Sequence, residues 1–343
     1  MTVTEDAGLE PAEVVDSPLR SRQAALGWLG SLVLVVLAAC LPAVLGAGYY
    51  LELATLVLLN AVFLMSLDLA VGRAGLVSVG HGSLLGLGSY VTGVLCVHYG
   101  LSFWPTVPVA MAVCGVIGLG IGVITLRLAG HYFVIGSLGL AVIISIVVTQ
   151  WSSLTNGNLG LSPIPRPAAI GVISFDDPRN FYEVMLAAAV VVALASWAFL
   201  RTTTGSRLRA IRENPRLASA LGVNVYATRI LVLVVSALLV GFAGSFQASY
   251  LGYIGPQVVD YVVGFQAVMA LIIGGQRSIA GAFVGALFFV LVPQALQFAS
   301  NLSVVVFGAA LIVVVILAPD GLWGRFVALL RWTRARVGTG TAR

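Results

Sequence analysis

The stretch LELATLVLLNAVFLMSLDLAV, residues 51–71, is apolar along almost its whole length, with Glu52 near one end and Asp68 near the other. A helix needs about 20 mostly apolar residues to cross the hydrocarbon core of a bilayer, and this stretch meets that requirement. The rest of the chain has the same character, since 59% of its 343 residues are hydrophobic and only 9% are charged. A soluble domain has about a quarter of its residues charged. We therefore expect most of the outer surface to face lipid, and the predicted fold class is an all-α polytopic membrane protein.

Similar runs recur along the chain and predict about ten transmembrane helices. The expected spans are 28–47, 51–71, 76–97, 106–126, 132–150, 181–200, 230–250, 261–275, 279–298 and 303–318. The eighth, 261–275, is short and ends in Gly274-Gly275, which favours a helix that is broken or re-entrant. Together the spans form one transmembrane domain, residues 28–320.

Glycine pairs four residues apart occur in several of these spans. Gly82 and Gly86 form one such pair, and Gly281 and Gly285 form another. Small residues at this spacing let helix backbones approach closely in lipid. These pairs therefore predict tight helix–helix contacts.

The distribution of arginine orients the spans, because short cytoplasmic loops of membrane proteins carry an excess of basic residues. With the N-terminus inside and ten crossings, all but two of the 18 basic residues fall on the cytoplasmic side. The exceptions, Arg166 and Arg179, lie in the longest external loop, residues 151–180. Both termini are then cytoplasmic, with a disordered acidic tail at 1–27 and a basic tail at 321–343.

Every basic residue is an arginine, which excludes two kinds of chemistry. Without lysine the chain has no P-loop lysine to hold nucleotide phosphates and no Schiff-base nucleophile. No acid–base pair or nucleophile triad stands out. The spacing of the cysteines and histidines does not suggest a metal centre or a disulfide framework; these residues are Cys40, Cys96, Cys114, His81, His98 and His131. We expect neither an enzyme nor a bound cofactor or metal, and no nucleic-acid partner.

The external loop 151–180 is rich in turn-forming residues. Pro163, Pro165 and Pro167 alternate with other residues, a pattern that favours extended backbone. Loops of this length often serve as a lid or a docking surface. A passive connector is the alternative, and composition does not decide between the two.

The stretch GSRLRAIRENPRLASALGVN, residues 205–224, lies in the cytoplasmic loop 201–229 and reads as two short amphipathic helices. Leu208 and Ile211 are three apart and share the apolar face of the first helix. The second helix is expected to begin at Asn214, as N-cap, with proline next. It is expected to stop at Gly222, which is well placed as a left-handed C-terminal residue.

Such a segment has three possible uses. It could lie on the anionic inner leaflet, held by its arginines and its apolar side chains. It could be an ordinary solvated loop that satisfies the orientation rule. It could also present an apolar edge flanked by charge to a cytosolic protein. The residues alone leave these uses open.

A few polar side chains inside the spans are candidates for a translocation path. Asp68 could be a proton relay, but Arg73 lies five residues on and a local ion pair is favoured. His81 could line a path, although a hydrogen bond between two helices is favoured slightly. The full set of path candidates is Asp68, Ser78, His81, Gln247 and Gln266, while Gln294 and Asn60 are further uncharged polar residues in spans.

Several blocks of the sequence resemble, in order, the permeases of branched-chain amino-acid ABC transporters of the LivM/LivH type. The resemblance covers roughly residues 50–325. The blocks are VGRAGLVSVGHGSLLGLGSYVTG (71–93), RLAGHYFVIGSLGLAVIISIVV (127–148), LTNGNLGLSPIPRP (154–167), the 205–248 segment that begins GSRLRAIRENPRLASALGVN, GGQRSIAGAFVGA (274–286) and LAPDGLWGR (317–325). The sequence departs from the family pattern at Asp68, Ser219 and Gln276-Arg277.

The resemblance implies a permease subunit of an ABC importer in the bacterial inner membrane, with ABC permease architecture. It implies four partners: separate ATPase subunits, a second homologous permease, an extracytoplasmic solute-binding protein and the membrane lipid. It also implies that the loop docks on the ATPase, which hydrolyses the ATP. The residues assigned to that coupling loop are Arg209, Arg212, Glu213, Arg216, Leu217, Leu221 and Gly222, with the two leucines as the apolar anchor.

The implied cargo is branched-chain amino acids. The same machinery carrying urea, amides or other amino acids is the first alternative. An ion-coupled secondary transporter working alone is a second alternative, and Asp68 is the feature that would support it.

Overall fold

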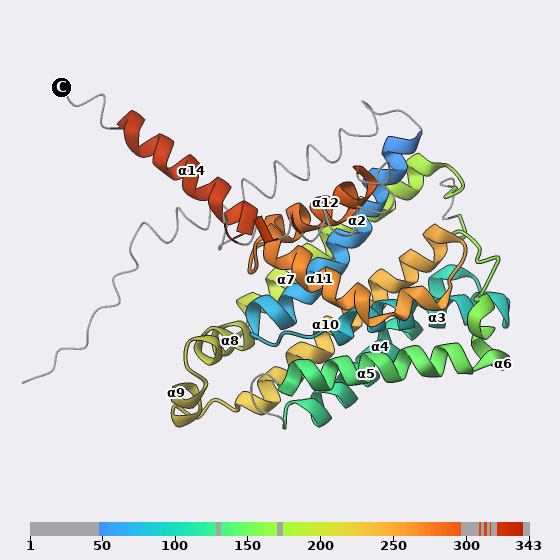
Figure 1. Cartoon of the computed structure of the whole chain (residues 1–343), viewed down its shortest axis with the longest axis horizontal. Coiled ribbons are helices and arrows are strands. Elements are labelled where there is room, and N and C mark those ends of the chain that lie inside the picture. Colours follow the sequence, from blue (N-terminus) through green and yellow to red (C-terminus); the bar gives the residue numbers. More distant parts are fainter. Residues whose placement is uncertain are drawn as a thin grey trace, which may run out of the picture.

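The computed structural model describes residues 48–127, 132–169, 174–295 and 321–338, together with isolated positions between 309 and 316. Within these ranges the chain is a bundle of helices with one isolated β-bridge and no strand (Figure 1). The elements are α2 (Tyr49–Asp68), the π-helix η1 (Leu69–Arg73), α3 (Gly80–Val97), α4 (Phe103–Thr125), α5 (Tyr132–Gln150), α6 (Ser152–Thr155), η2 (Gly157–Leu159), α7 (Pro178–Arg201), α8 (Thr203–Glu213), α9 (Pro215–Ala220), α10 (Val225–Leu251), η3 (Pro256–Val259), α11 (Tyr261–Gly274), α12 (Ile279–Ala295) and α14 (Gly321–Gly338).

Each predicted span within the described ranges corresponds to a helix, which confirms the all-α polytopic fold class. Five helical segments are long and apolar enough to cross a membrane: Tyr49–Arg73, Phe103–Thr125, Tyr132–Gln150, Pro178–Arg201 and Val225–Leu251. The acidic tail 1–27, the span 28–47 and nearly all of the span 303–318 lie outside the described residues. The count of ten crossings therefore stays a prediction.

Helix α11 is too short to cross a bilayer on its own. Its 14 residues cover about 21 Å at 1.5 Å per residue, whereas the hydrocarbon core is about 30 Å thick. The helix ends at Gly274, and Gly275 and Arg277 then take positive φ angles of 115° and 63°. The chain turns there into α12, which packs against α11. The eighth predicted span is thus a short helix followed at once by a tight turn.

Helix α2 forms the centre of the bundle. It contacts α7, α10 and α12 (Figure 1). In an 18-residue apolar stretch of the segment Tyr49–Arg73, 83% of the residues are buried by the rest of the bundle, against 22% in the equivalent stretch of α5. A helix that is apolar on every face can be surrounded by protein, and the run from Ala61 to Met65 has this composition. The stretch 51–71 thereby positions the charged end of α2 among the other helices.

Two of the glycine pairs bring helices into close contact, as predicted. A Cβ atom on Gly82 of α3 would collide with the backbone of Gly264 in α11. A Cβ atom on Gly285 of α12 would collide with the carbonyl oxygen of Ala270, also in α11. Helix α11 is therefore held between α3 and α12 by contacts that leave no room for a side chain.

The described parts of the predicted external loop, residues 151–169 and 174–180, lie at the end of the bundle opposite to α8 and α9 (Figure 1). Leu161 and Ile254 exchange backbone hydrogen bonds of 2.9 and 3.1 Å. The indole nitrogen of Trp104 donates to the carbonyl oxygen of Ala168 at 2.9 Å. Residues 170–173 lie outside the described part. The described portion is thus attached to α4 and to the connection between α10 and η3.

Candidate functional site

The loop between α7 and α10 contains the two short helices that its sequence predicts. Asn214 follows the last residue of α8, and its side chain caps α9 by accepting hydrogen bonds of 3.1 Å from the amides of Arg216 and Leu217. Pro215 is the first residue of α9. Gly222 follows the helix with a φ of 83°, a conformation that favours glycine. The predicted N-cap and stop residue are both confirmed.

The two helices of the loop differ in what they present. Leu208 and Ile211 of α8 are 1% and 0% exposed, and Leu208 belongs to an apolar cluster that includes Leu69 of η1. On the side of α9, Leu217 and Leu221 are 58% and 76% exposed. Helix α8 is therefore fixed to the bundle, whereas α9 offers two leucines to the outside.

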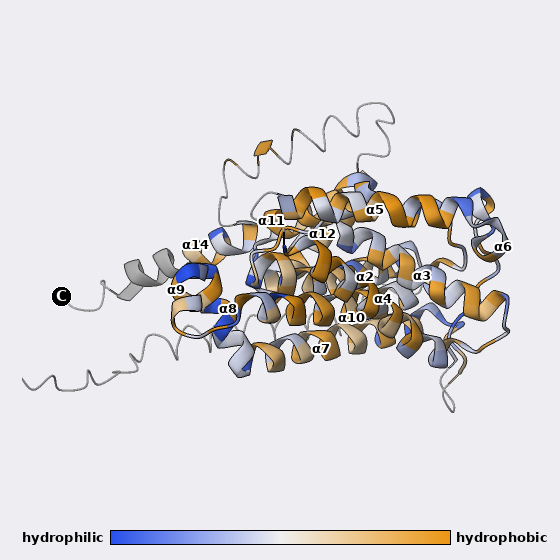
Figure 2. Ribbon diagram, turned by 90° about the horizontal axis from the view of Figure 1, so that it is seen from below, coloured by the Kyte–Doolittle hydropathy of each residue, from blue (hydrophilic) through white to orange (hydrophobic). Residues whose placement is uncertain are grey.

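Exposed charged residues lie in the same loop as these leucines. Glu213 and Arg216 are exposed, and the ribbon of α8 and α9 includes strongly hydrophilic residues at this end of the bundle (Figure 2). Arg209 is exposed as well, and its Nη2 donates to Ser206 Oγ of the same helix at 3.1 Å. The loop thus combines two exposed leucines with exposed charged side chains. Apolar residues accompanied by polar ones are common at protein–protein contacts.

Arg212 of α8 behaves differently from Arg209, because it reaches the bundle. Its Nη1 donates to the carbonyl oxygen of Val71 at 3.2 Å and to that of Gly72. Partial burial lowers the pKa of the Arg212 guanidinium, and the charge of Arg277 acts in the same direction. The ordinary pKa of arginine is so high that the group stays charged. A positive side chain thus meets the last carbonyl groups of the α2–η1 helix.

Asp68 joins the end of α2 to the turn between α11 and α12. It is 6% exposed, and its Oδ2 accepts a hydrogen bond from Arg73 Nε at 3.2 Å, which is also an ion pair. Its Oδ1 accepts from the backbone amide of Arg277 at 2.7 Å. Arg73 Nη2 donates in turn to the carbonyl oxygen of Arg277. The local pair with Arg73 was predicted from the sequence, whereas the contact with Arg277 was not.

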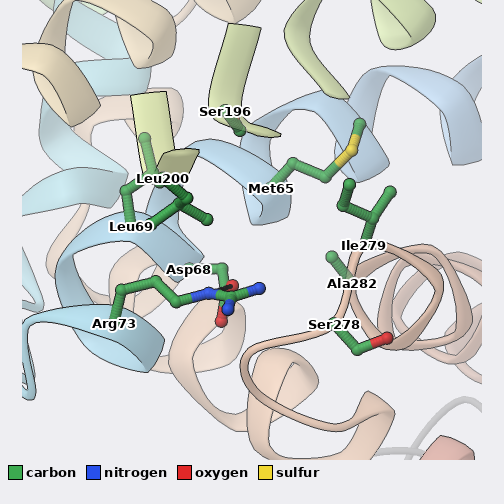
Figure 3. Close-up of a pocket in the computed structure, with 9 residues that line it drawn as sticks. All are labelled: Met65, Asp68, Leu69, Arg73, Ser196, Leu200, Ser278, Ile279 and Ala282. Atoms are coloured by element: carbon green, nitrogen blue, oxygen red, sulfur yellow. Dashed lines mark hydrogen bonds and ion pairs between the residues drawn. The ribbon is translucent and has the colours of Figure 1, made fainter. Parts of the chain in front are cut away.

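We call Asp68, Arg73, Arg212 and Arg277 the polar node. A small cavity of about 10 Å³ lies beside it, which is room for about one water molecule and far too little for an amino acid. Residues from α2, η1, α7, the α11–α12 turn and α12 line this cavity (Figure 3): Met65, Asp68, Leu69, Arg73, Ser196, Leu200, Ser278, Ile279 and Ala282. The cavity is therefore not a solute site.

His81 links three helices in the interior of the bundle. Its Nε2 lies 2.9 Å from Ser236 Oγ of α10, and that hydroxyl donates to the carbonyl oxygen of Ser66 in α2 at 2.6 Å. The interhelical hydrogen bond favoured from the sequence is confirmed. His81 Nδ1 and Ser78 Oγ are buried, and neither has a hydrogen-bond partner among the described residues.

The path candidates lie on α2, α3, α10 and α11 and just before α3. Gln247 of α10 accepts a hydrogen bond of 3.2 Å from Ser89 Oγ of α3. Gln266 is partly buried on α11. Among the described residues no hydrogen bond joins any two of Asp68, Ser78, His81, Gln247 and Gln266. Nor does that part of the chain hold a group of three metal-binding side chains.

The bundle of apolar helices, five of them long enough to cross a membrane, is the arrangement expected of a membrane transport permease. The chain belongs to the family described as the permease component of branched-chain amino acid transport systems, and it matches that family over residues 49–315. The match includes the two-helix loop and every residue of the polar node. Members of this family are multi-pass membrane transport proteins and not enzymes.

Two permease relatives, LivM and LivH, align with most of the chain. It is 25% identical over 311 residues to the high-affinity branched-chain amino acid transport permease LivM of Escherichia coli (strain K12), covering 84% of this chain and 73% of that one. It is 27% identical over 274 residues to LivH of Salmonella typhimurium, covering 74% and 87%. The guanosine ABC transporter permease NupQ of Bacillus subtilis is 34% identical over 147 residues, covering 43% and 41%. No solved structure matches the chain.

Proposed function

We propose that this chain is a permease subunit of an ABC importer in the bacterial inner membrane and that it translocates branched-chain amino acids. The family match over residues 49–315 carries this proposal. The relative named for guanosine covers 43% of the chain, whereas the LivM relative covers 84%. That difference favours branched-chain amino acids over urea, amides, nucleosides or other amino acids.

The proposal places two ATPase subunits at the end of the bundle that carries α8 and α9. Leu217 and Leu221 would insert into a groove of the ATPase, with Arg209, Arg216 and Glu213 around them. Their exposure supports this role, because two large apolar side chains project from an otherwise charged loop. That end of the bundle is then cytoplasmic, as are both termini.

A second homologous permease would complete the translocation path. Two permeases of this family, LivM and LivH, are both named for high-affinity branched-chain amino acid transport. Of the path candidates only Asp68 lines the small cavity beside the polar node, and an amino acid does not fit there, so we expect the path to form between two subunits. A solute-binding protein would deliver the amino acid to the opposite end, where residues 151–180 lie.

ATP would be bound by the ATPase subunits and not by this chain. The chain has no lysine and so cannot form the lysine-containing phosphate loop of such ATPases. An ion-coupled transporter working alone was the alternative that Asp68 would support. The polar node does not favour it, because Asp68 bonds to Arg73 and to the amide of Arg277. These contacts give Asp68 a structural role in joining the two segments.

Two experiments test the proposal. A pull-down of the tagged chain from native membranes should recover ATPase subunits and a second permease, and recovery of the chain alone would contradict it. Calorimetry on the solute-binding protein that joins this complex should show binding of leucine, isoleucine or valine. Binding of urea, an amide or a nucleoside instead would replace the cargo and leave the transport class intact.

A further inference from the structure

The carboxylate of Asp68 bonds to two segments that are far apart in the sequence. Asp68 Oδ1 accepts from the amide of Arg277 in the α11–α12 turn, while Oδ2 accepts from Arg73 at the end of η1. Arg73 closes the arrangement by donating to the carbonyl oxygen of Arg277. Hydrogen bonds to charged groups are stronger than neutral ones. The end of α2 and the α11–α12 turn are therefore expected to move together.

Arg212 connects the α8–α9 loop to this pair of turns. The last carbonyl groups of a helix have no partner within the helix, and a cation near them is stabilising. Arg212 Nη1 supplies that cation to the carbonyl groups of Val71 and Gly72. Leu208 adds an apolar contact in the same cluster as Leu69. Helix α8 thus contacts the helix end that carries Asp68 directly, and not only through the chain that joins α8 to α7.

The packing around the node leaves little freedom for relative movement. A Cβ atom on Gly72 would overlap the Asp68 carboxylate and lie 3.1 Å from the Arg277 amide nitrogen. Beyond the turn, a Cβ atom on Gly321 of α14 would collide with Gly275. Interfaces packed this closely shift as units and do not deform continuously.

We infer that Arg212 is a positioning residue that transmits movement of the α8–α9 loop to α2 and to the α11–α12 turn. Nucleotide-driven displacement of the loop pulls the end of η1 through Arg212, and Asp68 passes the displacement to Arg277. The short α11–α12 hairpin and the central helix then change position together. This inference rests on the proposed function of the loop as the ATPase contact and adds the route by which the contact reaches the bundle.

The first test compares two arginines of α8 in the complete importer in proteoliposomes. Arg212→Ala removes the bonds to η1, whereas Arg207→Ala removes an exposed arginine of the same helix. ATP hydrolysis and amino-acid uptake are measured together. Arg212→Ala is expected to lower uptake per ATP by about fivefold or more, the range of a typical coupling between sites, while Arg207→Ala leaves the ratio unchanged. An unchanged ratio in Arg212→Ala would overturn the inference.

A second measurement does not depend on how well Arg212→Ala assembles. Spin labels at Arg207→Cys on α8 and Gln276→Cys in the α11–α12 turn report their separation in the nucleotide-free and ATP-trapped complex. We expect this separation to stay constant while both labels move relative to a label at Gln150→Cys on α5. A separation that changes with nucleotide would show that α8 moves independently of the α11–α12 turn, which would overturn the inference.

Failure of the proposed function and failure of the transmission route give different experimental results. If the unaltered complex takes up no amino acid on ATP addition, the proposed function fails. If uptake is ATP-driven but Arg212→Ala keeps the normal ratio or the α8–turn distance changes, only the transmission route fails.

Discussion

The carboxylate of Asp68 accepts a hydrogen bond of 2.7 Å from the backbone amide of Arg277, which lies 209 residues further along the chain. This bond joins the end of the central helix α2 to the turn between α11 and α12. Arg212 reaches the same helix end from α8. Four charged residues from separate segments, those of the polar node, therefore meet at this end of the bundle.

Removal of the Asp68 carboxylate should destabilise the bundle. Asp68→Ala leaves the Arg277 amide and the Arg73 guanidinium without their acceptor, so we expect a loss of about 2–3 kcal/mol in the free energy of unfolding. Asp68→Asn keeps an oxygen that can accept from Arg277, and its loss should be smaller. Chemical unfolding of both variants in detergent measures the difference. Equal losses would mean that the Arg277 bond contributes little.

Gly72 should tolerate no side chain. Gly72→Ala would overlap the Asp68 carboxylate and should lower the thermal midpoint of the purified protein by several degrees. Gly120 of α4 is the matched control, because nothing lies within 4 Å of a Cβ atom built there. Gly120→Ala should be neutral, or stabilising by up to about 1 kcal/mol, since alanine favours helix over glycine. Similar midpoints for the two variants would contradict the packing of the node.

The bond between His81 and Ser236 should have a measurable coupling energy. Hydrogen bonds between membrane helices average about 0.6 kcal/mol and reach about 1.7 kcal/mol. A double-mutant cycle with His81→Ala and Ser236→Ala should give a value in this range from unfolding free energies. A cycle of His81→Ala with Ser245→Ala serves as control, because Ser245 bonds to Thr92 instead. Equal coupling in both cycles would argue against a specific His81–Ser236 contact.

The exposed leucines of the loop should anchor the ATPase. Leu217→Asp or Leu221→Asp places a charge in the proposed apolar contact, so the variant should reach the membrane but lose the co-purifying ATPase. Leu159→Asp is a suitable control, since Leu159 is 78% exposed but lies in η2 at the opposite end. Retention of the ATPase by both loop variants would place the anchor elsewhere.

Features that depend on neighbours in the sequence could be predicted from the sequence. Apolar runs located each helix span within the described residues, because length and composition alone determine whether a segment can cross a bilayer. Asn214 and Gly222 marked helix ends through local backbone chemistry. Arg73 is close enough to Asp68 along the helix for their ion pair to be expected.

Contacts between distant segments could not be predicted in this way. Arg209 and Arg212 look equivalent in the loop sequence, and only the packing of α8 on η1 directs Arg212 to the carbonyl groups of Val71 and Gly72. The positive φ of Arg277 has no signal in its residue type, since non-glycine residues rarely adopt it. The path candidates were chosen by polarity within spans, which does not determine which helix faces meet.

ATP-dependent uptake is the most direct test of the central claim. Proteoliposomes would contain this chain, the second permease and the ATPase subunits, with the binding protein and radiolabelled leucine added outside. We expect leucine to accumulate inside the proteoliposomes only when ATP is supplied on the side of the α8–α9 loop. Accumulation driven by an ion gradient in vesicles without the ATPase would contradict it.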